Sequence, residues 1–260
     1  MPDKFQAREI ISRQIKELKE YGIYSEVHRG HCTIWTGWVD MAKILQENGI
    51  KMDLSYYPYR YFQSGYLNGS GLPMKFIDEN GTILDLYEQS TQWADDVTLT
   101  DKTFVNPFSI RDLIKATENT LKESLEIYHT ALTFCIHPIN MRPNILNSIE
   151  WLKSVLEYCK RNNIPVLDAT SWLKFTENRR KIRLIDVKES ESTFTFKINS
   201  SSSINNLTLI VSSSYKGRKI SQVKVNGIDK DYILKTINGI EYGIIILNLK
   251  EGLTNITIKY

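Results

Sequence analysis

The chain has 260 residues, of which 42% are hydrophobic and 24% charged, a composition typical of globular proteins. It excludes a disordered chain, and three cysteines are too few for a disulfide scaffold. The net charge of +3 is too balanced to indicate nucleic acid or an anionic membrane as a partner. With no apolar run long enough for a membrane span and no signal peptide, we expect a cytoplasmic protein, or an envelope or extracellular one if the native chain is longer.

Residue usage changes near residue 180. Every Trp, His, Cys and Pro precedes that point, and Ser, Ile, Asn and Lys dominate after it. We therefore predict a first domain over residues 1–180, which carries the chemistry, and a second domain over residues 181–260.

The first domain alternates helical and extended patterns, which is typical of parallel βαβ units in a layered sheet or a (β/α) barrel. A hairpin is predicted around Asn80-Gly81, and Ser109 with Asp112 predicts a capped helix start. Thr170 is predicted to cap the last helix. In chain order we expect helices over 5–20, 38–49, 109–128, 145–161 and 171–180, and extended segments over 23–27, 50–57, 74–88, 131–137 and 165–169.

The second domain lacks helical periodicity. Apolar residues alternate at Phe194, Phe196 and Ile198, and turn dipeptides such as Asn226-Gly227 recur. About seven short strands in this length predict an all-β sandwich.

Active sites of open α/β sheets and α/β barrels form at the carboxyl ends of strands. Three of the four histidines lie at predicted strand ends, which indicates a site there. For each residue a structural role remains open: a histidine held by a backbone carbonyl, a carboxylate that caps a helix or accepts in a turn. The candidates at strand ends are His28, Arg29, His31, Asp53, Tyr56, Tyr57, Glu88, His137 and Asp168.

An aromatic segment follows the second of these strands. It includes Tyr56, Tyr57 and Tyr61, and aromatic faces of this kind stack on sugar rings at binding sites. Packing in a core is the alternative for the same residues.

Several blocks together resemble the later half of the polysaccharide deacetylase-like (NodB-homology) family over roughly residues 5–180. They read HRGHCTIWTGW, GIKMDLSYY, GYLNGSGLPMKFIDENGTILDLYEQSTQ, HTALTFCIHP and NNIPVLDATSWLKF. The resemblance implies a partial or deformed (β/α) barrel of NodB type. In that family a divalent metal, often zinc, activates a water that attacks an N- or O-acetyl group of a sugar polymer.

The resemblance also implies roles for single residues. Cys135-Ile136-His137 is similar to the family's late Leu-x-His motif, so His137 would be the general acid. Arg29 would help to wall and orient the site, and Asp53 would support the catalytic histidine. His31, Trp35, Tyr56, Tyr57, Tyr61 and Glu88 complete the expected catalytic and substrate-binding set.

The family's Thr-Phe-Asp-Asp-Gly and His-x-x-x-His motifs, which supply metal ligands and base, have no match in these 260 residues. Three interpretations follow. A further segment completes the site; the protein binds a glycan without catalysis; or His28, His31 and His137 form a different zinc site. We therefore expect no tightly bound metal in this chain unless the motifs come from elsewhere. We expect carbohydrate as the ligand, and a homo-oligomer or a partner segment that completes the barrel.

Overall fold

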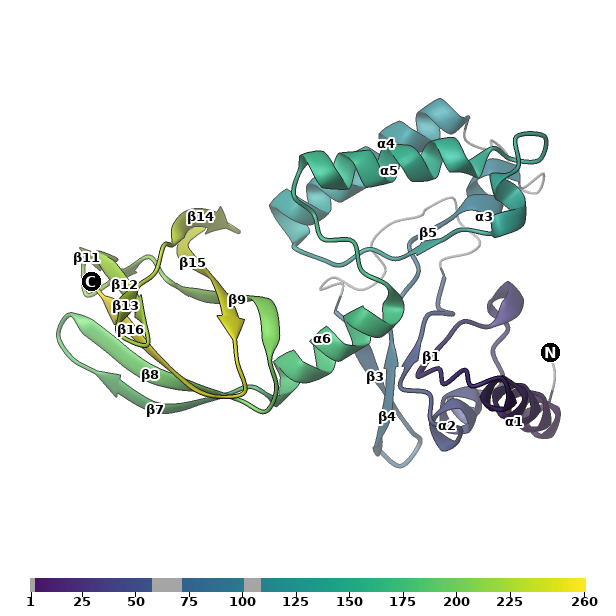
Figure 1. Ribbon diagram of the computed structural model, residues 1–260, viewed down its shortest axis with the longest axis horizontal. Coiled ribbons are helices and arrows are strands. Elements are labelled where there is room, and N and C mark those ends of the chain that lie inside the picture. The colour runs from purple at the N-terminus through teal and green to yellow at the C-terminus, as the bar shows by residue number, and fades with distance from the viewer. Residues whose placement is uncertain (1–2, 58–71, 101–108) are drawn as a thin grey trace. The chain divides into compact units, whose positions relative to one another are not determined.

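The computed structural model describes residues 3–57, 72–100 and 109–260, which fall into two compact units, Met1–Thr170 and Ser171–Tyr260 (Figure 1). The division precedes the boundary predicted at residue 180. Most of helix α6 (Ala169–Lys181) belongs to the second unit, because Phe175 and the following Ile182 pack against that unit's core. Each unit is described by itself below.

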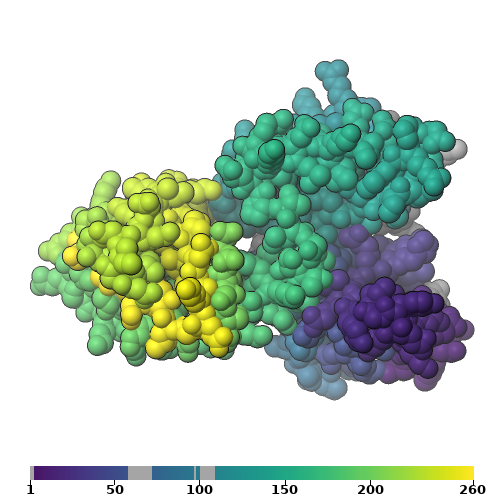
Figure 2. Space-filling model, in the orientation of Figure 1, coloured from purple at the N-terminus to yellow at the C-terminus, as the bar shows by residue number. Residues whose placement is uncertain are grey.

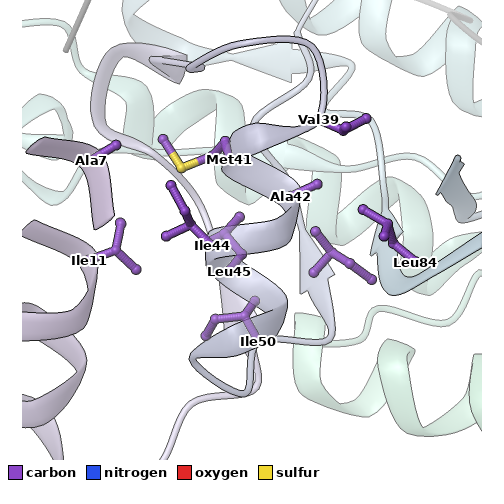
Figure 3. Packing of buried hydrophobic residues seen from close by; sticks show 10 residues of the cluster. Ala7, Ile11, Val39, Met41, Ala42, Ile44, Leu45, Ile50 and Leu84 are labelled. Carbon is purple, nitrogen blue, oxygen red and sulfur yellow. The ribbon is translucent and has the colours of Figure 1, made fainter. Parts of the chain in front are cut away.

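The first unit opens with two packed helices, α1 (Lys4–Glu20) and α2 (Asp40–Glu47). The Asp3 side chain caps α1 by accepting from the backbone N–H groups of Phe5 and Gln6. Figure 3 shows the apolar faces of the two helices meeting, together with a residue of strand β4. The buried residues labelled there are Ala7, Ile11, Val39, Met41, Ala42, Ile44, Leu45, Ile50 and Leu84.

A four-stranded sheet with the order β1-β2-β4-β3 carries the predicted strand ends. Its three parallel strands are β1 (Val27–His28), β2 (Met52–Asp53) and β4 (Ile83–Glu88). The antiparallel strand β3 (Met74–Ile77) forms the predicted hairpin with β4. Gly81 permits this turn at a φ of 80°, and Asp78 Oδ1 accepts from the backbone N–H groups of Asn80 and Thr82.

The rest of the first unit is a parallel strand pair with helices. Strand β5 (Trp93–Ala94) pairs with β6 (Phe134–Cys135). The helices are α3 (Asp95–Thr100), α4 (Ile110–Glu123), its π-helical extension η2 (Ser124–Tyr128) and α5 (Ser148–Arg161). Helices α4 and α5 lie side by side (Figure 1), where the fully buried Trp151 donates to Thr117 Oγ1 at 3.0 Å.

Two expectations for this unit are wrong, and a third, the barrel, is not established by the structure. The strand predicted over residues 165–169 is not formed, because residues 165–168 are in no strand and Ala169 begins α6. Thr170 lies inside α6 and does not cap it. Among the described residues, the strands form a sheet of four and a separate pair rather than a closed barrel. The architecture that is established is mixed α/β.

The second unit is antiparallel and rich in strands. One sheet has the order β13-β12-β16-β8-β7, a second β14-β15-β9, and β10 pairs with β11. Residues from both larger sheets form one hydrophobic cluster, the arrangement of facing sheets. The bounds are β7 Arg183–Glu189, β8 Thr193–Ser200, β9 Ile204–Ser212, β10 Ser214–Tyr215, β11 Arg218–Lys219, β12 Gln222–Val225, β13 Ile228–Asp229, β14 Ile233–Ile237, β15 Ile240–Leu249 and β16 Gly252–Lys259.

The last strand of the chain is central to this unit. Strand β16 pairs with both β8 and β12, so the start and the end of the unit lie side by side in space (Figure 2). In the described ranges, no helix combines the length and the apolar character that crossing a bilayer requires.

Candidate functional site

Three ionisable residues stand in one row across the four-stranded sheet. The register pairs His28 of β1 with Asp53 of β2, and Asp53 with Glu88 of β4. Residues in register on parallel neighbours point to the same face of a sheet. The strand ends predicted at these residues are confirmed, and they bring an imidazole and two carboxyl groups together.

His28 is held by a fully buried carboxylate. Its Nδ1 lies 2.6 Å from Asp53 Oδ1, and Asp53 is 0% exposed. Asp53 also accepts from the backbone N–H and the hydroxyl of Ser55, each at 2.9 Å. Because a carboxylate only accepts, Nδ1 carries the proton and Nε2 is the nitrogen left for chemistry.

A glycine lets the chain approach this pair closely. The Gly30 N–H donates to Ser55 Oγ at 2.8 Å. A Cβ at residue 30 would lie 3.3 Å from the Ile34 carbonyl oxygen and 3.4 Å from Ser55 Oγ, so a side chain would press on the hydroxyl that supports Asp53.

Glu88 is the neutral member of the row. Burial, the negative charge of Asp53 and a hydrogen bond with Asp53 raise the pKa of Glu88 far above its usual range, while the Tyr56 N–H and Arg29 oppose the rise. Glu88 therefore keeps its proton at neutral pH, so it adds no second negative charge beside Asp53.

A second imidazole–carboxylate pair lies at the end of the β5–β6 strand pair. His137, two residues after β6, has its Nδ1 2.6 Å from Oδ1 of Asp95, which directly follows β5 and is 0% exposed. Asp95 Oδ2 accepts from the His137 N–H at 3.0 Å and from the Ser148 hydroxyl at 3.2 Å. Asp95 Oδ1 also accepts from the Asp96 N–H, so His137 is locked with Nε2 outward.

Asp95, Asp96 and His137 form the group among the described residues whose ligand atoms lie close enough for a metal ion, all within 4.8 Å of one another. His137 Nε2 is 3.9 Å from Asp96 Oδ2. However, Asp95 already accepts three N–H hydrogen bonds, two at Oδ1 and one at Oδ2, and the Ser148 hydroxyl lies 3.2 Å from Oδ2. A metal would have to displace them, so this group suits an acid–base pair better than a tight metal site.

Arg29 follows His28 and lies near the strand that leads to His137. It donates from Nη2 to Thr91 Oγ1 at 2.8 Å and from Nε to the Leu54 carbonyl at 3.3 Å. Burial raises the pKa of Cys135 on β6, and nearby Arg29 opposes that shift. The positive charge next to His28 is thus also close to Cys135, two residues before His137.

The turn after His28 is strained. Cys32 and Thr33 both adopt left-handed conformations, with φ of 53° and 50°, inside the short 3₁₀ helix η1 (His31–Thr33). For a β-branched residue such as Thr33 this is unusual, and backbone strain concentrates at functional sites.

The other expected site residues are placed as follows. Tyr56 is 55% exposed beside Glu88, Tyr57 is half-buried, and His31 is exposed. Trp35 is half-buried and stacks on Phe76 at 5.4 Å, so it serves packing. Tyr61 lies outside the described residues.

Two groupings that the sequence left open or favoured differ from this geometry. His28, His31 and His137 do not form a metal-binding group within the described part of the chain. Asp53 orients a histidine, but that histidine is His28, and the support of His137 comes from Asp95.

Asp95 and Asp96 are the functional residues that sequence reasoning missed. The rule that polar residues at strand ends build sites applies to Asp95. Sequence periodicity does not reveal this strand end, because β5 has only two residues.

No protein-family model matches the chain, and no curated protein matches it. The geometry of the two pairs therefore carries the functional argument.

Proposed function

We propose that the first unit acts on acetylated carbohydrate as a deacetylase-like hydrolase related to the NodB-type barrel. The observation that carries the proposal is the His137–Asp95 pair. An imidazole fixed through Nδ1 by a buried carboxylate presents Nε2 for proton transfer. Cleavage of an acetyl group needs such a residue to protonate the departing sugar nitrogen or oxygen.

The surroundings of the pair support this role. The His137 side chain is 41% exposed, so a large substrate has access to it, whereas Asp95 is shielded from water. Arg29 supplies a positive charge and N–H donors that suit an oxyanion. A carbohydrate substrate is supported by the resemblance and by the half-exposed side chain of Tyr56, whose backbone N–H donates to Glu88.

The metal of the family does not fit the described residues. Its ligand set of one aspartate and two histidines has no counterpart among the described residues, where the group of possible ligands is Asp95, Asp96 and His137. Asp95 already accepts three N–H hydrogen bonds, which a metal would have to displace. No step of the proposal uses a metal.

The test is release of acetate by the full chain from N-acetylated chito-oligosaccharide and from O-acetylated xylo-oligosaccharide. His137→Gln should lower kcat/KM about 10²–10⁴-fold, the usual worth of a general acid. His129→Gln, at an exposed histidine that ends η2, is the matched control and should keep full activity. Wild-type activity that His137→Gln leaves unchanged would refute the proposal.

Glycan binding without catalysis is the second candidate, favoured by the exposed Tyr56 ring. It predicts that the same oligosaccharides bind with unchanged affinity to His137→Gln and more weakly to Tyr56→Ala. Titration calorimetry on both variants separates the two candidates when no acetate is released.

A further inference from the structure

The row formed by His28, Asp53 and Glu88 contains one carboxyl group more than a structural ion pair needs. Two carboxyl groups and an imidazole occupy adjacent positions in register, and both carboxyl residues are buried. Burying a carboxyl group costs free energy unless it is hydrogen-bonded or protonated. Asp53 alone would be enough to hold His28 in place.

The hydrogen bonds of the row converge on Asp53. Asp53 accepts from His28 Nδ1 and from the N–H and hydroxyl of Ser55, and protonated Glu88 interacts with it from the other side. The bond from Nδ1 to Asp53 leaves His28 Nε2 available, and the His28 side chain is 19% exposed.

The ionisable groups around His28 come from two strands and from the turn after β1. Asp53 lies on β2, Glu88 on β4 behind Asp53, and Arg29 follows His28 itself. The anionic Asp53 stabilises an imidazolium at His28, as a carboxylate does in an acid–base triad. Neutral Glu88 supports Asp53 without adding a second negative charge.

We propose that His28 is a second catalytic residue of this site, the general base that works opposite His137. This inference rests on the proposed hydrolase function and adds a residue that the family resemblance did not assign to catalysis. It follows from the similarity of the two pairs and from Arg29, which directly follows His28 and lies near Cys135, two residues before His137.

The proton balance of the reaction closes. His28 Nε2 takes a proton from a water molecule whose oxygen forms a bond to the acetyl carbon. The bond from that carbon to the sugar nitrogen or oxygen breaks, and the leaving atom takes a proton from His137 Nε2. Acetic acid and the free sugar leave, and transfer of one proton from His28 to His137 through solvent restores the starting state.

The pH dependence of kcat/KM tests the assignment. The wild type should give a bell-shaped profile whose acid limb reports the base and whose alkaline limb reports the acid. His28→Gln should lose about 10²–10⁴-fold in kcat/KM and lose the acid limb, whereas His137→Gln should lose the alkaline limb. The His129→Gln control should keep both limbs.

The outcomes separate this inference from the proposed function. A His28→Gln variant that keeps the acid limb, or loses less than about threefold, would overturn the role of His28 and leave His137 in place. Wild-type protein that releases no acetate from either substrate would overturn both proposals.

A measurement on the wild type tests the inference even if a variant does not fold. Proton–nitrogen correlation spectra at neutral pH distinguish the two imidazole tautomers. The structure requires the proton of neutral His28 on Nδ1, which leaves Nε2 free to accept. A neutral His28 with its proton on Nε2 would overturn the inference.

Discussion

The two units of this protein bury different kinds of side chain. The second unit has a core of aliphatic side chains from two sheets, and its strands lead to no cluster of ionisable groups in the part of the chain that is described. The first unit buries Asp53, Glu88 and Asp95 at strand ends. Buried ionisable groups cost stability and are retained where they do chemistry. The comparison therefore supports the first unit as the place of the proposed reaction.

The sharpest test of this comparison is Asp95→Asn. An asparagine amide turned toward His137 Nδ1 favours the wrong tautomer, so kcat/KM for acetate release should fall about 10²–10⁴-fold. Steady-state assays measure the loss, and circular dichroism checks the fold. Asp231→Asn, at an exposed aspartate of the second unit, should change neither. Equal losses in both variants would erase the distinction between the units.

A core substitution in the second unit should lower stability without lowering activity. Ile256 is 1% exposed within the cluster between the sheets, so Ile256→Ala should lower the free energy of unfolding of that unit by about 2–5 kcal/mol. Denaturant titration measures this change. Ile228→Ala, at a side chain that is 73% exposed, should cost no more than about 0.5 kcal/mol. Below the unfolding transition, Ile256→Ala should keep its rate of acetate release.

The neutral carboxyl group of the first unit predicts a pH effect on stability. The folded state holds the Glu88 proton above the pH at which the unfolded chain releases it, so wild-type stability should fall as pH rises from about 5 to 8. Glu88→Gln has no proton to lose. Its stability relative to wild type should therefore rise with pH, by at most about 1.4 kcal/mol per pH unit.

Denaturant titration of the wild type and Glu88→Gln at several pH values gives this difference directly. Glu157→Gln, at an exposed glutamate of α5, is the control and should follow the wild-type curve. Parallel curves for Glu88→Gln and wild type would mean that Glu88 is ionised in the folded protein.

The smallest expected effect is that of metal removal. Because Asp95 already accepts three N–H hydrogen bonds, we expect no stoichiometric zinc in the purified chain. Chelation should not change its melting temperature. A site filled at 100 times its Kd would add about 2.7 kcal/mol of stability, which such a melt would detect. One zinc per chain by elemental analysis would reinstate a metal at Asp95, Asp96 and His137.

The sequence by itself determined the local features. The hairpin at Asn80-Gly81, the Ser109 helix cap, the strand ends at His28, Asp53 and Glu88, and the strand-rich second unit all followed from it. These features depend on turn chemistry, capping and periodicity, which act between residues close in the chain.

The tertiary structure alone decided which carboxylate serves which histidine. Asp53 and His28 are 25 residues apart, and Asp95 and His137 are 42 apart. Strand order and register bring each pair together, and the two-residue strands β5 and β6 are too short for a hydrophobic period to predict. The same pairing decides that Glu88 is neutral, because the pKa of a buried carboxyl group depends on neighbours that the sequence does not place beside it.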